Sequence, residues 1–286
     1  GADARFPRPV WTGAGWALFW GQSEGVDGDT LLALRGPDGR PASVPRVVLG
    51  RHFADAVWLG DAFFVAGVEN GRASFARPAA DGSPGLVTEP FRLPTASFSE
   101  GRLASGPAGI AVVWSDGLRS LWFMRLDRDA RELTAAVQIA EAAGRQHDPS
   151  VVADANGYTV AWKDDRADPD GNAAPAIYVR QLTVDGQPRG PERRLASGTS
   201  PDLIRRAGGG YLLAFVDHRD GRNDDVYVAP LGSDGSRAGP DVLVSDSPAN
   251  ARAPSLAPLG AGAAVAWHDR RQDPADAIRV ARLAPD

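Results

Sequence analysis

An internal repeat runs through this 286-residue chain and constrains its fold more than any other feature. Two copies read PSVVADANGYTVAWKDDR, over 149–166, and PSLAPLGAGAAVAWHDRR, over 254–271. A related segment reads SPDLIRRAGGGYLLAFVDHR and ends at Arg219. Each copy has a proline, a short apolar run, a glycine-rich turn, a second apolar run ending in an aromatic residue, and then an aspartate and an arginine. Such copies, about 48 residues long and six in number, account for the whole chain.

Each repeat contains the pattern of several short β-strands. The aromatic anchors of the second strand are Trp20, Trp114, Trp162, Phe215 and Trp267. A third apolar run follows each anchor, as in AIYVRQL and DVYVAPL, and a fourth short run such as RVVLG or RRLAS completes five of the repeats. Turn signals separate the third run from the fourth, at Asp38-Gly39, Asp81-Gly82, Asp129-Ala130, Asp185-Gly186 and Asp234-Gly235. We expect a two-residue hairpin turn at each, because glycine tolerates the positive φ that such turns require.

Repeated units of four antiparallel strands predict an all-β fold, a six-bladed β-propeller with four strands per blade. We expect one domain over 1–286, with blades over about 5–52, 53–97, 98–147, 148–199, 200–250 and 251–286. The segment Asp129–Ala142 is interpreted as a turn and a strand rather than a helix. We expect the aromatic anchors to fill the spaces between blades.

The last repeat ends before its fourth strand, since Asp286 falls where the turn should be. Either Gly1–Phe6 supplies a short closing strand for that blade, or the blade has three strands. We favour the closing strand.

Composition excludes several classes of function. A net charge of -5 argues against binding the nucleic-acid backbone, which requires a basic surface. No apolar run is long enough to span a membrane as a helix. Cysteine is absent, so disulfides, thiolate metal sites and cysteine nucleophiles are excluded. Lys163 is the single lysine, which leaves few candidates for a Schiff-base or general-base lysine.

Charged residues gather where the second strand meets the third and where one blade crosses to the next, and these loops lie on one face of a propeller. The candidates for a binding face are Asp164, Arg166, Asp217, His218, Arg219, His268, Asp269 and Arg271, with Arg145, His147 and Arg252 at the crossovers. Three adjacent blades carry the same Asp-x-Arg pair. A repeated pair favours a structural fastener, in which the aspartate accepts N–H groups of its own loop and the arginine reaches the next blade. The alternative is a polar face that binds a sugar or an anionic group.

A metal site is a second hypothesis for these loops. Asp165, Asp168, Asp170 and Asn172 place oxygen ligands at the spacing of a calcium loop, although the downstream glutamate of an EF-hand is missing. The same residues beside glycine are ordinary turn formers. Calcium is the only cofactor that the sequence suggests, and the four scattered histidines make a poor zinc site.

The repeat, Trp-x-Asp-x-Arg followed by Ile-Tyr-Val-Arg and Asp-Gly, resembles the repeats of bacterial extracellular propellers of the sialidase-like superfamily. This resemblance covers the chain and implies the fold and an extracellular or periplasmic location. Sialidases carry a Phe/Tyr-Arg-Ile-Pro motif, an arginine triad and Asp-boxes. Phe91-Arg92-Leu93-Pro94 is close to the first motif but lies at a different place in the chain. Ser115-Asp116-Gly117 followed by Trp122 has the wrong spacing for an Asp-box. The resemblance therefore implies the fold and not the activity.

These observations favour a non-catalytic binding module, a monomer that recognises a glycan or a protein partner through its polar loop face. No set of nucleophile, base and orienting group can be assembled from the sequence. The alternative is a sialidase-like glycoside hydrolase or lyase that uses Asp164, Asp217 and Asp269. A third hypothesis is an assembly role in which the unfinished last blade is a docking edge.

Overall fold

The structure, a computed structural model, describes residues 3–24, 27–88, 93–95, 97–167, 174–219, 221, 223–245, 250–269 and 277–284. Within these residues there are strands and turns but no helix, so no helix of that part of the chain could cross a membrane. The strands form six successive antiparallel sheets, which are the blades of a six-bladed β-propeller. The predicted fold class is confirmed.

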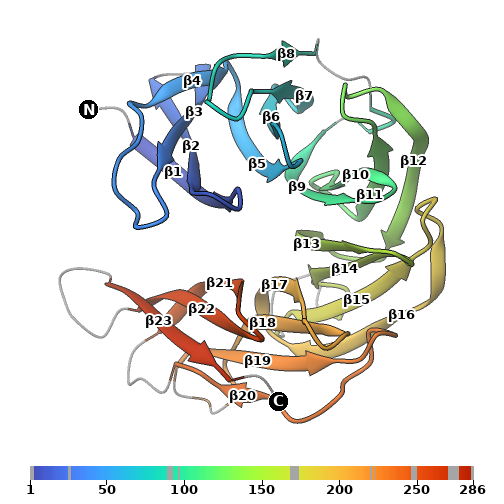
Figure 1. The fold of residues 1–286 in the computed structure, drawn as a ribbon. Coiled ribbons are helices and arrows are strands. Elements are labelled where there is room, and N and C mark those ends of the chain that lie inside the picture. The colour runs from blue at the N-terminus through green and yellow to red at the C-terminus, as the bar shows by residue number, and fades with distance from the viewer. Residues whose placement is uncertain are drawn as a thin grey trace. The chain divides into compact units, whose positions relative to one another are not determined.

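The first three sheets pair their strands in chain order (Figure 1). They are β1 (Asp3–Trp11), β2 (Trp16–Glu24), β3 (Asp27–Arg35) and β4 (Arg46–Leu49); β5 (His52–Trp58), β6 (Phe63–Glu69), β7 (Arg72–Arg77) and β8 (Leu86–Val87); and β9 (Ser99–Gly106), β10 (Gly109–Ser115), β11 (Ser120–Leu126) and β12 (Glu132–Glu141). The strand β12 confirms the interpretation of Asp129–Ala142 as a turn and a strand.

The last three sheets follow the same order (Figure 1). They are β13 (Gln146–Asp154), β14 (Gly157–Asp164), β15 (Ala176–Leu182) and β16 (Pro188–Ser197); β17 (Thr199–Arg205), β18 (Tyr211–Asp217), β19 (Asp225–Leu231) and β20 (Val242–Leu243); and β21 (Ala251–Leu259), β22 (Gly262–Asp269) and β23 (Ala277–Leu283).

The chain divides into two compact units. The first is Gly1–Gly117 with Trp122–Gln138, and the second is Leu118–Leu121 with Ile139–Asp286. Strands β11 and β12 each contribute residues to both units. The expectation of a single domain over 1–286 stays a prediction.

The N-terminal residues extend the first blade. Asp3, Ala4 and Arg5 pair with Ser23, Gln22 and Gly21 of β2, so they belong to β1. The expectation that this segment serves the last blade as a closing strand is therefore wrong for these residues. In the described residues the last blade has the three strands β21, β22 and β23, which was the other alternative.

The Asp-Gly turns are longer than predicted. Gly39 donates its N–H to the carbonyl of Gly36 at 2.9 Å, and only Gly39 of the dipeptide has a positive φ, 80°. The same bond recurs at Gly186 and Gly235, so these are hairpin loops with one glycine in the left-handed region rather than two-residue turns. The aspartate side chain secures the loop by accepting an N–H two residues on, as Asp38 does from Arg40 at 3.1 Å.

The expectation that aromatic anchors fill the spaces between consecutive blades is confirmed for Trp114, Phe215 and Trp267, whereas Trp20 is half-buried. In the first unit Trp114 of β10 packs with Phe64 of β6 and Phe75 of β7. In the second unit Phe215 of β18 packs with Ile177 of β15. The anchors Trp114, Trp162 and Phe215 are 0% exposed.

The inner strand of nearly every blade is bulged. The register of its pairing with the second strand shifts near the start of the inner strand. At this shift, one residue that is not glycine has a positive φ. These residues are Phe6, Glu100, Asp148, Ser200 and Ala253, with φ between 47° and 54°. Such a backbone costs about 1 kcal/mol or more per residue, so the surrounding structure must impose it.

In three blades a polar side chain at the bulge of the inner strand accepts an N–H of the next inner strand. Asp55 of β5 accepts the N–H of Leu103 of β9 at 2.9 Å. In the second unit, Ser150 of β13 accepts the N–H of Leu203 of β17 at 3.0 Å, and Asp202 accepts the N–H of Leu256 of β21 at 2.7 Å. We call these contacts the inner-strand links.

The link at Asp55 predicts a large loss of stability on substitution. Asp55 is 2% exposed and also accepts the N–H of Ala56 and pairs with Arg8 at 3.0 Å. Replacing it, Asp55→Ala, leaves buried donors unsatisfied and should lower the free energy of unfolding by about 3 kcal/mol in a urea titration. The control Asp61→Ala removes an exposed ion pair with Arg128 and should cost less than about 1 kcal/mol. Equal losses for the two variants would contradict this role of Asp55.

Candidate functional site

In the Asp-x-Arg pair of the fourth blade, the arginine binds the aspartate of its own loop. Asp164 ends β14, is 0% exposed, and accepts a hydrogen bond from Trp162 Nε1 at 2.8 Å. It also accepts the backbone N–H of Arg166 at 2.9 Å and two bonds from its guanidinium, at 2.8 and 2.6 Å. The guanidinium lies 4.1 Å from the ring centre of Tyr178, which stacks on Trp162. Both carboxylate oxygens of Asp164 are thus occupied.

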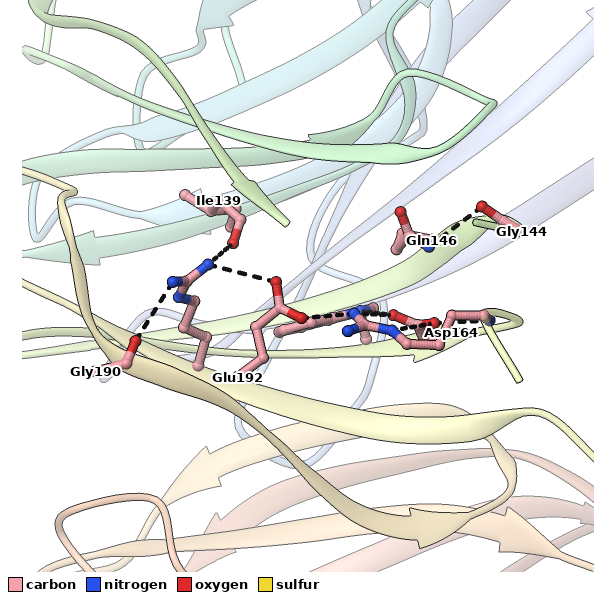
Figure 2. A network of polar contacts seen from close by, with 9 residues as sticks. Ile139, Gly144, Gln146, Asp164, Gly190 and Glu192 are labelled. Carbon is pink, nitrogen blue, oxygen red and sulfur yellow. Dashed lines mark hydrogen bonds and ion pairs between the residues drawn. The ribbon is translucent and has the colours of Figure 1, made fainter. Parts of the chain in front are cut away.

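The network continues to the outer strand of the same blade (Figure 2). Glu192 of β16 binds Arg166 at 2.6 Å through one oxygen and Arg180 of β15 at 3.4 Å through the other. Arg180 donates in turn to the carbonyls of Ile139 at 2.7 Å and Gly190 at 3.4 Å.

Electrostatics strengthen this arrangement. Partial burial lowers the pKa of Arg166, but its hydrogen bonds to Asp164 and Glu192 outweigh burial and raise the pKa above its usual value. The guanidinium is therefore a permanent cation between two carboxylates.

The fifth blade repeats the pair. Arg219 donates to Asp217 at 2.7 Å and to Asp241 at 2.8 Å, and it lies 3.9 Å from the ring centre of Tyr227. Arg237 also pairs with Asp241, while burial and the nearby Arg219 lower the pKa of Arg237. In the sixth blade Asp269 is 0% exposed, and Arg271 lies outside the described residues.

These contacts support the fastener interpretation with one correction. Arg166 and Arg219 reach the outer part of their own blade, not the next blade as expected. The sequence did not predict the outer partners Glu192 and Asp241. Glu192 lies 26 positions after Arg166 and Asp241 lies 22 positions after Arg219, and no local pattern indicates that they pair. A buried carboxylate held by an arginine is poorly placed to exchange a proton with a substrate.

Beside the buried carboxylate of Asp164, a second polar group is partly exposed. His147 of β13 lies with its Nε2 3.1 Å from Asp165, and Lys163 Nζ lies 3.8 Å from the other oxygen of that carboxylate. Their side chains are 12%, 25% and 19% exposed for His147, Asp165 and Lys163 respectively. Arg145 is exposed next to them, and its carbonyl accepts the N–H of Asp165 at 2.9 Å.

The fifth and sixth blades carry related groups at the same ends of their strands. His218 Nδ1 lies 3.3 Å from Asp224, with more than half of the histidine side chain exposed. Arg252 of β21 is the register partner of His268 of β22, and both are exposed. Among the expected binding-face residues of these blades that the structure describes, Asp217 and Asp269 are therefore buried, whereas His218, Arg252 and His268 are exposed.

The predicted calcium loop is only partly described. Asp168, Asp170 and Asn172 lie outside the described residues, whereas the carboxylate of Asp165 faces His147 and Lys163. Calcium binding stays a prediction.

A groove at the opposite ends of the strands was missed by the sequence analysis. It lies between the fourth and fifth blades, beside Asp154, Gly157, Arg205 and Tyr211, and has a volume of about 510 Å³. Asp154 pairs with Gly157 at one end of β13 and β14, whereas Gln146 pairs with Asp164 at the other. The residues that line the groove belong to tight turns and strand ends. The sequence pattern predicts turns and strands at these positions but no binding site.

Comparison with known proteins supports the fold alone. No protein-family model and no curated protein matches the sequence. A protein of unknown function from Dyadobacter fermentans aligns at a TM-score of 0.61 with 12% identity, over 98% of this chain and 93% of its own. The subtype N10 neuraminidase-like protein of a little yellow-shouldered bat influenza virus aligns at 0.60 with 9% identity, over 98% and 94%. A chain of a nidogen/laminin complex aligns at 0.53 with 14% identity, over 89% and 88%. The predicted resemblance to sialidase-like propellers is confirmed at the level of fold.

The fastener of the fourth blade predicts a specific loss of stability. Arg166→Gln leaves the buried carboxylate of Asp164 without its counter-ion and should lower the free energy of unfolding by about 3 kcal/mol in a urea titration. Adding Asp164→Asn to that variant removes the uncompensated charge and should restore part of the loss. The control Arg193→Gln breaks an exposed pair with Asp234 and should cost less than about 1 kcal/mol. A loss for Arg166→Gln as small as that of the control would contradict the fastener.

Proposed function

We propose that this propeller is a non-catalytic binding module that recognises a glycan through a polar loop face, with a protein partner as the other class of ligand. The polar loop face consists of Arg145, His147, Lys163, Asp165, His218, Arg252 and His268. These residues lie at one end of the fourth, fifth and sixth blades, at the starts of the inner strands and the ends of the second strands. An extracellular or periplasmic location is part of this proposal.

One observation carries the proposal. The aspartates that could serve as acid or base, Asp164 and Asp217, are buried and bound to arginines of their own loops. A glycosidase needs two carboxyl groups that can reach the sugar from either side. Both of these carboxylates are engaged in holding their blades together.

The neighbouring groups are suited to binding. Guanidinium, imidazole, ammonium and carboxylate groups offer both donors and acceptors, which hydroxyl-rich ligands require. Pairs such as His147 with Asp165 hold the side chains in place before a ligand arrives. Preorganisation of this kind lowers the entropy lost on binding.

Titration with glycans tests the proposal. A glycan that binds should raise the midpoint of thermal unfolding, since a ligand at 100 times its Kd adds about 2.7 kcal/mol. Lys163→Ala and Arg252→Ala should each weaken binding about tenfold, because each removes a charged hydrogen-bond donor. Arg40→Ala, at an exposed turn of the first blade, should leave the Kd unchanged.

The panel should contain neutral and acidic oligosaccharides, and Kd should be measured by calorimetry. Binding that survives both face substitutions would contradict the assignment of the polar loop face. Failure of every glycan to bind would shift the proposal to a protein partner.

A hydrolase remains the second candidate, because His147 and Asp165 form a histidine–carboxylate pair. Such a pair can orient a general acid or base. The leading proposal expects no release of nitrophenol from nitrophenyl glycosides by the purified chain. If turnover is found and both His147→Gln and Asp165→Asn abolish it while Arg40→Ala does not, the hydrolase replaces the binding module.

A further inference from the structure

The groove between the fourth and fifth blades is a second candidate binding site. Its main part has a volume of about 510 Å³, and Gln181, Arg189 and Asp234 line both this part and a smaller hollow of about 250 Å³. These volumes fall in the range of small-molecule sites. The groove lies at the ends of the strands away from the polar loop face.

The groove is held open by hydrogen bonds that cross between the two blades. Tyr211 of the fifth blade donates its hydroxyl to Asp154 of the fourth at 2.6 Å. Gln181 of the fourth blade donates to the carbonyl of Ser233 of the fifth at 2.6 Å. Both walls are therefore fixed relative to each other within this unit, and the site is preformed.

The carboxylates of the groove already have partners. Asp154 accepts the hydroxyl of Tyr211 and, at 2.6 Å, the N–H of Asn156. Asp234 accepts the N–H and hydroxyl of Ser236 at 3.0 and 2.6 Å and pairs with Arg193. These contacts hold both carboxylates in place, and Asp234 already has a cationic partner in Arg193.

Two guanidinium groups supply the capacity for a ligand. Arg189 is exposed and donates one bond, to the carbonyl of Asn156 at 3.2 Å, out of the five N–H groups of a guanidinium. Arg205 is exposed on the fifth-blade side of the groove. The groove thus offers a positively charged donor on each wall, and guanidinium groups form strong hydrogen bonds with a carboxylate of a ligand.

The rest of the lining can bind hydroxyl groups. Tyr158 and Tyr211 are each 3% exposed, so their rings do not form an open apolar platform. Asn156 and Gln181 also line the groove, and their side-chain amides offer both donors and acceptors.

We propose that this groove binds an acidic oligosaccharide, with a carboxylate of the sugar held between Arg189 and Arg205. The amide groups of Gln181 and Asn156 bind its hydroxyl groups. This site is separate from the polar loop face and does not depend on it.

Calorimetric titration with trigalacturonate and with the neutral galactotriose tests the inference. Trigalacturonate should bind, and galactotriose should bind at least about tenfold more weakly. Arg189→Gln and Arg205→Gln should each raise the Kd for trigalacturonate at least about tenfold. The matched control is Arg194→Gln, an exposed arginine of β16 that does not line the groove, and it should leave the Kd unchanged.

Absence of trigalacturonate binding, equal binding of the two sugars, or equal effects of all three arginine variants would overturn the inference. Lys163→Ala separates it from the proposed function. That variant should not change binding in the groove, so a glycan that is lost only with Lys163→Ala binds the polar loop face. A glycan that is lost only with Arg189→Gln or Arg205→Gln binds the groove.

Discussion

The inner-strand links are the interaction on which this architecture depends. Each blade is an antiparallel sheet, and the inner strands β9, β17 and β21 also donate an N–H to a side chain of the preceding blade. Asp55, Ser150 and Asp202 accept those N–H groups from positions next to a bulge. At Ser150 and Asp202 the bulge also contains a left-handed residue, Asp148 or Ser200. A buried donor left unsatisfied costs about 1–3 kcal/mol, which is similar to the cost of this strain, so the links help to hold the strained backbone in place.

The fasteners have a different role, because they connect the outer part of a blade to the end of its second strand. The fourth and fifth blades each contain a stack of three groups, which are an aromatic anchor, an aromatic ring of the neighbouring strand and an arginine. In the fourth blade these are Trp162, Tyr178 and Arg166. The arginine then joins the aspartate of its own loop to an acidic residue farther along the chain. The aspartates Asp164 and Asp217 are engaged in this way, which moves the functional question to the residues beside the fasteners.

The two ends of the blades in the second unit differ in chemistry. At one end, histidines lie near carboxylates and accessible cations, as in His147 with Asp165 and Lys163. At the other end, Asp154 and Asp234 are held by hydrogen bonds, and Arg189 and Arg205 remain as donors around a preformed groove. The first surface suits a ligand that needs both donors and acceptors, and the second suits an anion. Both surfaces are built from turns and strand ends, so the sheets provide rigid support without supplying the ligand contacts themselves.

The sequence by itself determined the number of blades, the strands within them, the aromatic anchors and the position of the turns. All of these follow from the alternation of apolar and polar residues within each strand and from the period of the repeat. Both patterns can be seen in the sequence without knowledge of the tertiary contacts. It also determined that the Asp-x-Arg pairs recur, and recurrence favoured a structural role. Only the tertiary structure decided the partners of these pairs, the inner-strand links and the groove. Glu192 meets Arg166, and Leu203 meets Ser150 across 53 residues, because the folding of whole sheets brings them together. No local pattern encodes such contacts, since each depends on the register of several strands at once.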